Sequence, residues 1–163
     1  MIVVLSVISF LLDGILLRFL SPNTIFLPLF TIVSLVIIYP YFNDDNYRYF
    51  KYTAILGLLY DIVYFNTIFF NTFIFMFLGF AVIFFSYLLS NNLYVDTLIT
   101  VICIVLYRII NYIFVVLFRN VDFSFLSLFK SIYSSLIINI LYCIVLYLIS
   151  EFYSRKHKIL RSK

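Results

Sequence analysis

Three charged side chains lie inside otherwise apolar segments, and they are the residues that could do chemistry. Asp13, Asp61 and Arg108 each fall within a run of Leu, Ile, Val, Phe and Tyr. If each run is a helix that crosses a bilayer, a rise of about 1.5 Å per residue puts all three side chains about 16 to 21 Å from one membrane face. A lone charge at that depth costs several kcal/mol, so we expect Arg108 to face at least one of the two aspartates.

Two asparagines could extend this polar group. Asn111 follows Arg108 by one helical turn, and Asn139 lies in the last apolar run, so their amide groups could add hydrogen bonds. Two interpretations stay open for the network. It is either a proton or ion relay, substrate site or coupling element, or else a structural clasp that fixes how the helices pack. Arginine stays charged and is a poor relay, which favours the clasp for Arg108, whereas an aspartate inside a membrane is equally a candidate functional group.

No pattern in the sequence predicts an enzyme. The apolar runs contain no histidine, no glycine-rich phosphate loop and no serine in a nucleophile motif. Cys103 and Cys143 both lie in apolar runs, which is typical of small buried hydrophobic residues and not of a disulfide or a metal pair. We therefore expect no catalytic residue, no cofactor and no metal site.

The composition is that of a polytopic membrane protein. Of 163 residues, 66% are hydrophobic and 11% are charged, and the mean hydropathy is +1.17, whereas soluble domains carry about 25% charged residues. The net charge is +4, but five of the eleven basic residues lie in the last nine positions. A basic tail after an apolar run is typical of a cytoplasmic anchor on anionic lipid headgroups, so we expect the lipid bilayer and no nucleic acid as a partner.

Windows of about 20 apolar residues predict an all-α bundle of six membrane-spanning helices. The spans are expected at about 2–20, 24–41, 49–65, 71–90, 94–118 and 127–150, in one domain, 1–153, followed by the basic tail, 154–163. The first run lacks basic residues before it and a cleavage site after it, so we expect it to be retained. Arg48, Lys51 and the tail predict that both termini are cytoplasmic. No repeat of 20 to 50 residues is evident.

This layout and one local motif resemble the MreD family of rod shape-determining membrane proteins. The motif is Gly57, apolar residues, Asp61, a short loop and a following helix with Gly79, and Asp13 and Pro22-Asn23 add to it. The resemblance implies a non-catalytic, multi-pass scaffold of the elongasome in the bacterial cytoplasmic membrane, concerned with cell shape and peptidoglycan synthesis. The implied partners are MreC and, further, RodA, a class B penicillin-binding transpeptidase and the actin-like MreB.

MreD-like proteins also resemble in fold the substrate-binding subunits, or S-components, of energy-coupling-factor vitamin transporters. The alternative function is therefore that of a vitamin-capturing subunit. Such subunits often display small residues on the first helix for docking to the transport partner, and the first run here offers only Ser6, Ser9 and Gly14. The two functions differ in what the protein binds, MreC or a vitamin.

Overall fold

The computed structural model describes residues 2–19, 28–42, 45–65, 69–89, 92–119 and 123–156. Within these ranges the chain is helical apart from short connections, and it contains no strand. The elements are α1 (Ile2–Phe19), α2 (Phe30–Ile38), the 3-10 helix η1 (Tyr39–Phe42), α3 (Asn46–Tyr60), the π-helical turn η2 (Asp61–Phe65), α4 (Phe70–Leu88), α5 (Leu93–Arg119) and α6 (Phe125–Lys156). The predicted all-α class is therefore confirmed.

Each predicted window overlaps one α-helix, and the bounds differ most at α2 and α6. The second window was expected to begin at 24; residues 24–27 lie outside the described residues, and α2 begins at Phe30, two residues after Pro28. The last window was expected to end at 150, but α6 continues to Lys156 because no glycine or proline interrupts it. The rest of the predicted basic tail, 157–163, and the Pro22-Asn23 pair of the motif lie outside the described residues.

By length and composition, three helical segments among the described residues can cross a membrane. They are Phe70–Leu88, Leu93–Phe118 and Phe125–Ser154. The apolar segments Val3–Leu16 and Phe30–Phe42 are shorter, and α3 opens with the polar residues Asn46, Arg48 and Lys51. Membrane crossing by α1, α2 and α3 therefore stays a prediction.

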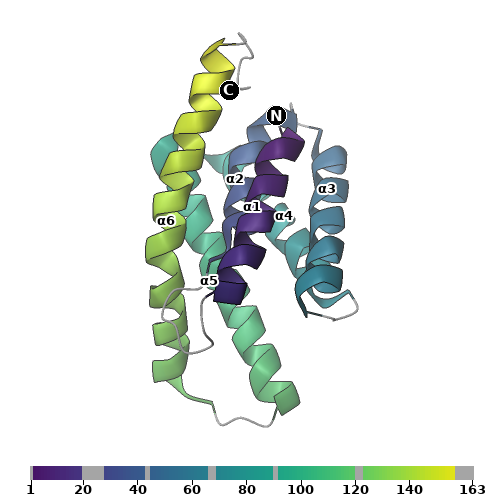
Figure 1. Ribbon diagram of the computed structural model, residues 1–163, viewed down its shortest axis with the longest axis vertical. Coiled ribbons are helices and arrows are strands. Elements are labelled where there is room, and N and C mark those ends of the chain that lie inside the picture. The colour runs from purple at the N-terminus through teal and green to yellow at the C-terminus, as the bar shows by residue number, and fades with distance from the viewer. Residues whose placement is uncertain are drawn as a thin grey trace.

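The start of α1 and the end of α6 lie at the same end of the molecule, as an even number of crossings requires (Figure 1). Their cytoplasmic location stays a prediction. Between these two helices runs α2, in which every residue from Phe30 to Ile38 is buried. This short helix packs against α1, α4, α5 and α6, so it forms the centre of the bundle.

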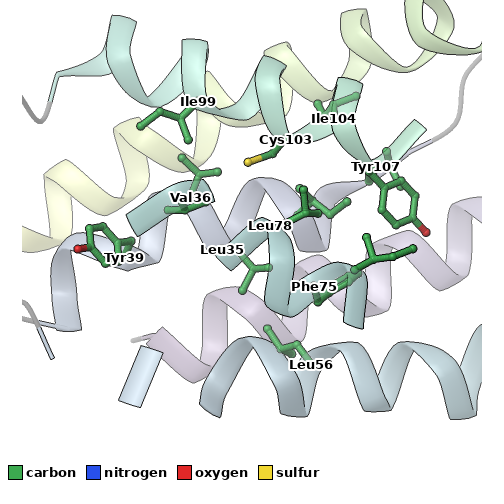
Figure 2. Close-up of a cluster of buried hydrophobic side chains, with 14 of the residues drawn as sticks. Leu35, Val36, Tyr39, Leu56, Phe75, Leu78, Ile99, Cys103, Ile104 and Tyr107 are labelled. Atoms are coloured by element: carbon green, nitrogen blue, oxygen red, sulfur yellow. The ribbon is translucent and has the colours of Figure 1, made fainter. Parts of the chain in front are cut away.

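Two apolar clusters flank α2. On one side Leu35 and Val36 pack with side chains of α3, α4 and α5, including Phe75 and Cys103 (Figure 2). The other side packs with α1 and α6, in a cluster of Leu5, Val33, Ile37, Ile38, Cys143 and Leu146. Cys103 and Cys143 are both buried, as the sequence predicts. The interior on both sides of α2 is thus filled by side chains.

Candidate functional site

The first backbone amides of α2 have no acceptor in the side chain that precedes them, because the N-cap residue is Leu29. An unpaired amide in apolar surroundings costs several kcal/mol. Asp13 of α1 supplies the acceptors: its Oδ1 accepts from the amide of Phe30 at 2.7 Å, and its Oδ2 accepts from the amide and hydroxyl of Thr31 at 2.9 and 2.6 Å. The carboxylate therefore lies at the positive end of the α2 dipole.

Asp61 caps α4 in the same way. The N-cap residue, Phe69, is apolar and takes a left-handed conformation with φ 63°. Oδ1 of Asp61 accepts from the amide of Asn71 at 2.9 Å and from its Nδ2 at 3.0 Å, and Oδ2 accepts from the amide and the hydroxyl of Thr72, both at 2.9 Å. Asp13 is 0% exposed and Asp61 is 1% exposed, so both carboxylates lie inside the bundle. The hydrogen bonds from helix amides and hydroxyls offset the cost of burying them there.

These two caps share one arrangement. In each, one carboxylate oxygen accepts a hydrogen bond from a backbone amide. The other oxygen accepts hydrogen bonds from the next amide and from the hydroxyl of a threonine. The aspartate precedes the first bonded amide by 17 residues in α1–α2 and by 10 residues in α3–α4. No repeat was evident in the sequence because the connections differ in length and only the aspartate and the threonine recur.

Polar side chains of α5 and α6 join the two caps. Asn139 Oδ1 accepts from the amide of Leu29 at 2.8 Å, directly beside the Asp13 cap, and Asn139 Nδ2 donates to the carbonyl of Ser135 at 2.7 Å. Arg108 Nε donates to Ser135 Oγ at 2.9 Å. On the side of the Asp61 cap, the hydroxyl of Tyr107 donates to Asn71 Oδ1 at 3.2 Å.

The hydroxyl of Tyr60 also hydrogen-bonds to the Asp13 side chain, and Tyr60 directly precedes Asp61. Side chains or backbone groups from all six α-helices and η2 thus form one group, linked by hydrogen bonds and, at Leu29–Phe30, Tyr60–Asp61 and Tyr107–Arg108, by adjacent positions in the chain. We call this group the polar belt. Its members are Asp13, Leu29, Phe30, Thr31, Tyr60, Asp61, Asn71, Thr72, Tyr107, Arg108, Ser135 and Asn139.

Four of the five residues singled out from the sequence belong to this belt. The fifth, Asn111, donates from Nδ2 to the carbonyl of Tyr107 at 2.9 Å, within its own helix. The bonds described differ from those expected, because helix amides and threonine hydroxyls bind the aspartates and Arg108 donates to Ser135. A direct contact between Arg108 and an aspartate stays a prediction.

Sequence reasoning missed the residues that complete the caps, above all Thr31 and Thr72. A usable signal was present at both helix starts. Leu29 and Phe69 occupy N-cap positions that favour Ser, Thr, Asp or Asn. An apolar N-cap inside a membrane segment, followed by threonine in the first turn, indicates that a side chain from elsewhere must cap the helix.

Two glycines bring the start of α4 close enough to α3 for this cap. A Cβ atom at Gly57 would lie 2.7 Å from Cα of Thr72 and 2.9 Å from the carbonyl oxygen of Asn71. At Gly79 a Cβ would lie 2.8 Å from Cγ2 of Thr53. The motif residues Gly57, Asp61 and Gly79 thus act together in the contact between α3 and α4.

Gly14 has a corresponding place between α1 and the turn η2. A Cβ atom there would lie 2.5 Å from the hydroxyl of Tyr64, which donates to the carbonyl oxygen of Phe10 at 2.5 Å. The glycine beside Asp13 therefore leaves room for the contact between α1 and η2.

The chemistry that this site performs is hydrogen bonding between helices. The two carboxylates bind amides that need acceptors wherever the surroundings are apolar. Within the described ranges, no group of three His, Cys, Asp or Glu could hold a metal ion. Geometry of this kind fixes helix positions.

Residues 1–157 of the chain match a protein family described as rod shape-determining protein MreD. The matched range contains the six α-helices and every residue of the polar belt. Comparisons with curated proteins and with solved structures give no significant match.

Proposed function

The chain belongs to the MreD family of rod shape-determining proteins, and from this premise we propose that it is a non-catalytic scaffold of the cell-wall elongation machinery. In this role it binds MreC and helps to regulate peptidoglycan synthesis and cell shape. It works in the bacterial cytoplasmic membrane, with six helices crossing and both termini inside. RodA, a class B penicillin-binding transpeptidase and MreB are the further members of the assembly.

The polar belt is the observation that supports a scaffold over a relay or a transporter. A relay or a substrate site needs a carboxylate that exchanges its partners. Asp13 and Asp61 instead bind the first amides of α2 and α4, and releasing those amides would cost several kcal/mol in apolar surroundings. The position of the aspartates therefore favours a structural role.

Loss of rod shape on depletion of the protein tests the proposal. We expect depleted cells to round up and the wild-type gene to restore rods. Full-length MreC, co-expressed with the tagged chain, should be recovered with it from detergent-solubilised membranes. Retained rods and no recovery of MreC would refute the scaffold. A vitamin held by the purified protein through size-exclusion chromatography would favour the transport subunit instead.

A further inference from the structure

Three exposed tyrosines lie at one level, where α3 begins, α4 ends and α5 begins. Tyr47, Tyr87 and Tyr94 are 69%, 89% and 84% exposed. Counted from the members of the polar belt in η2, α4 and α5, they lie about 21, 24 and 21 Å away, at about 1.5 Å per residue. The start of α3 is at the same end of the molecule as the start of α1 (Figure 1). We call the level of these three side chains the tyrosine plane.

Two observations indicate that the tyrosine plane lies at a membrane–water interface, where exposed tyrosines are common. The candidate spans Phe70–Leu88 and Leu93–Phe118 end and begin directly beside two of the tyrosines. On the opposite side of the polar belt, Arg18 and Lys130 are exposed, about 8 Å from the belt along their helices. These two charges and the tyrosine plane are therefore about 30 Å apart, which is the thickness of a hydrocarbon core.

Two cations of α3 lie at or near the tyrosine plane. Arg48 follows Tyr47 directly; its side chain is 80% exposed and pairs with Asp45 at 2.8 Å. Lys51 lies one helical turn nearer the polar belt, but its Nζ is 4.4 Å from the ring centre of Tyr47, so the side chain reaches back toward the plane. Among the described residues no carboxylate pairs with Lys51. Its ammonium can therefore donate to an anion from outside the protein.

We propose that Lys51, with Tyr47 and Arg48, binds the phosphate of an anionic phospholipid headgroup at this end of the molecule. Headgroup phosphates lie just outside the hydrocarbon core, at the level of the tyrosine plane. Because Arg48 offsets the charge of Asp45, Lys51 leaves the start of α3 with a net positive charge. A zwitterionic headgroup would bring its own cation beside Lys51, so the site should select anionic lipid. Contact with the Tyr47 ring holds the ammonium in place before the lipid binds, which lowers the entropic cost of binding.

Fluorescence quenching by brominated lipids tests this site, because the chain contains no tryptophan. Tyr47→Trp places a single fluorophore at the tyrosine plane and keeps an aromatic ring beside Lys51. The full chain is reconstituted in mixtures of phosphatidylglycerol and phosphatidylcholine in which one lipid is brominated. We expect phosphatidylglycerol to bind beside the tryptophan about fivefold more strongly than phosphatidylcholine, and Lys51→Gln to bring this ratio close to one. A ratio close to one with Lys51 in place would overturn the proposal.

Controls in the same Tyr47→Trp protein separate this site from the other cations and from free phosphate. Lys130→Gln, on the opposite side of the polar belt, should leave the ratio unchanged, and so should Arg161→Gln with Lys163→Gln in the basic tail. If either control lowers the ratio as much as Lys51→Gln does, net charge and not this site selects the lipid, and the proposal fails. An excess of soluble glycerol phosphate should also leave the ratio unchanged. A fall in the ratio would show that the site takes phosphate from solution, which contradicts a lipid site.

Discussion

At the scale of single residues, Asp13 and Asp61 are buried charges whose described partners are helix amides and hydroxyls. The N-terminus of a helix carries about half a positive charge, and a hydrogen bond to a charged group contributes about 1.5 to 3 kcal/mol. The three bonds to Asp13 from Phe30 and Thr31, together with the one from Tyr60, and the four to Asp61 offset much of the cost of burying each carboxylate. Each aspartate also fixes the point at which the next helix begins.

Replacement of Asp61 by alanine should therefore cost more than replacement by asparagine. Asp61→Ala leaves the amides of Asn71 and Thr72 without this acceptor, and we expect a loss of about 2 to 5 kcal/mol in the free energy of unfolding. Asp61→Asn retains one acceptor oxygen, so its loss should be about 1 to 3 kcal/mol. At Asp13, replacement by alanine should likewise lower the free energy of unfolding more than replacement by asparagine. Unfolding of the detergent-solubilised protein measures both effects.

The control for these variants is Asp45→Ala at the exposed start of α3. Asp45 accepts from the amide of Arg48 at 3.1 Å and pairs with its side chain at 2.8 Å. An exposed cap of this kind contributes about 1 kcal/mol. If Asp61→Ala is no more destabilising than Asp45→Ala, the buried caps do not have the role described here.

The sequence predicted which residues lie together more successfully than it predicted their bonds. Asp13, Asp61 and Arg108, which were expected at one level from their depth along each apolar run, all belong to the polar belt. The sequence-based prediction considered only the pairing of Arg108 with an aspartate. Backbone amides can replace a cation, but only where a helix begins inside the bundle, and the start of α2 at Phe30 could not be read from an apolar run that continues on both sides of Pro28.

At the scale of elements, α3 and α4 pack closely against each other, and the two glycines between them face different kinds of atoms. Gly57 faces the backbone of Asn71 and Thr72, whereas Gly79 faces the side chain of Thr53. A backbone atom can make room for an added Cβ only if the whole helix moves. A side-chain neighbour can be shortened by mutation.

This difference predicts which alanine variant can be rescued. Gly57→Ala should lower stability by about 1 to 3 kcal/mol, net of a gain of about 1 kcal/mol in helix propensity, because α4 must shift away from Asp61. Gly79→Ala should also destabilise the protein, and Thr53→Ala should restore most of that loss. Unfolding curves of the two single variants and of the double variant provide the measurement. A Gly57→Ala protein as stable as the wild type would contradict the close approach of the two backbones.

Secondary structure followed from the sequence wherever the segment was long and apolar. The fourth and fifth windows, 71–90 and 94–118, differ from α4 and α5 by one or two residues at each end. The third window could not reveal that its last turn is the π-helical η2. A π turn adds one residue to the hydrogen-bonded ring, and tertiary contacts, such as the one from Tyr64 to Phe10, select it.

At the scale of the whole molecule, the start of α1 and the end of α6 lie at one end (Figure 1), and the predicted topology puts Arg48, Lys51 and the basic tail on that side. Lys51 lies 4.4 Å from the ring centre of Tyr47 near the start of α3, a pair typical of a membrane interface. Arg48 is also exposed there. Positively charged loops tend to stay in the cytoplasm, so these residues favour a cytoplasmic location for this end of the molecule.

Reporter fusions test this orientation. A fluorescent protein fused after Lys163 should fluoresce, since it folds in the cytoplasm. Alkaline phosphatase inserted in the connection at 120–122 should be active, because that connection should lie outside. Phosphatase inserted at 43–44 should be inactive and serves as the control. Activity at 43–44 together with inactivity at 120–122 would reverse the topology, and activity at neither would show that α3, α4 and α5 do not together make an odd number of crossings.

The bond between the amide of Leu29 and the side chain of Asn139 joins residues 110 positions apart. The ribosome delivers α2 long before it delivers α6, so the central helix is made while the amide of its N-cap residue, Leu29, still lacks its final acceptor. Assembly of the bundle therefore cannot be completed from the N-terminus onward as each segment emerges. The last helix to be synthesised finishes the start of the second.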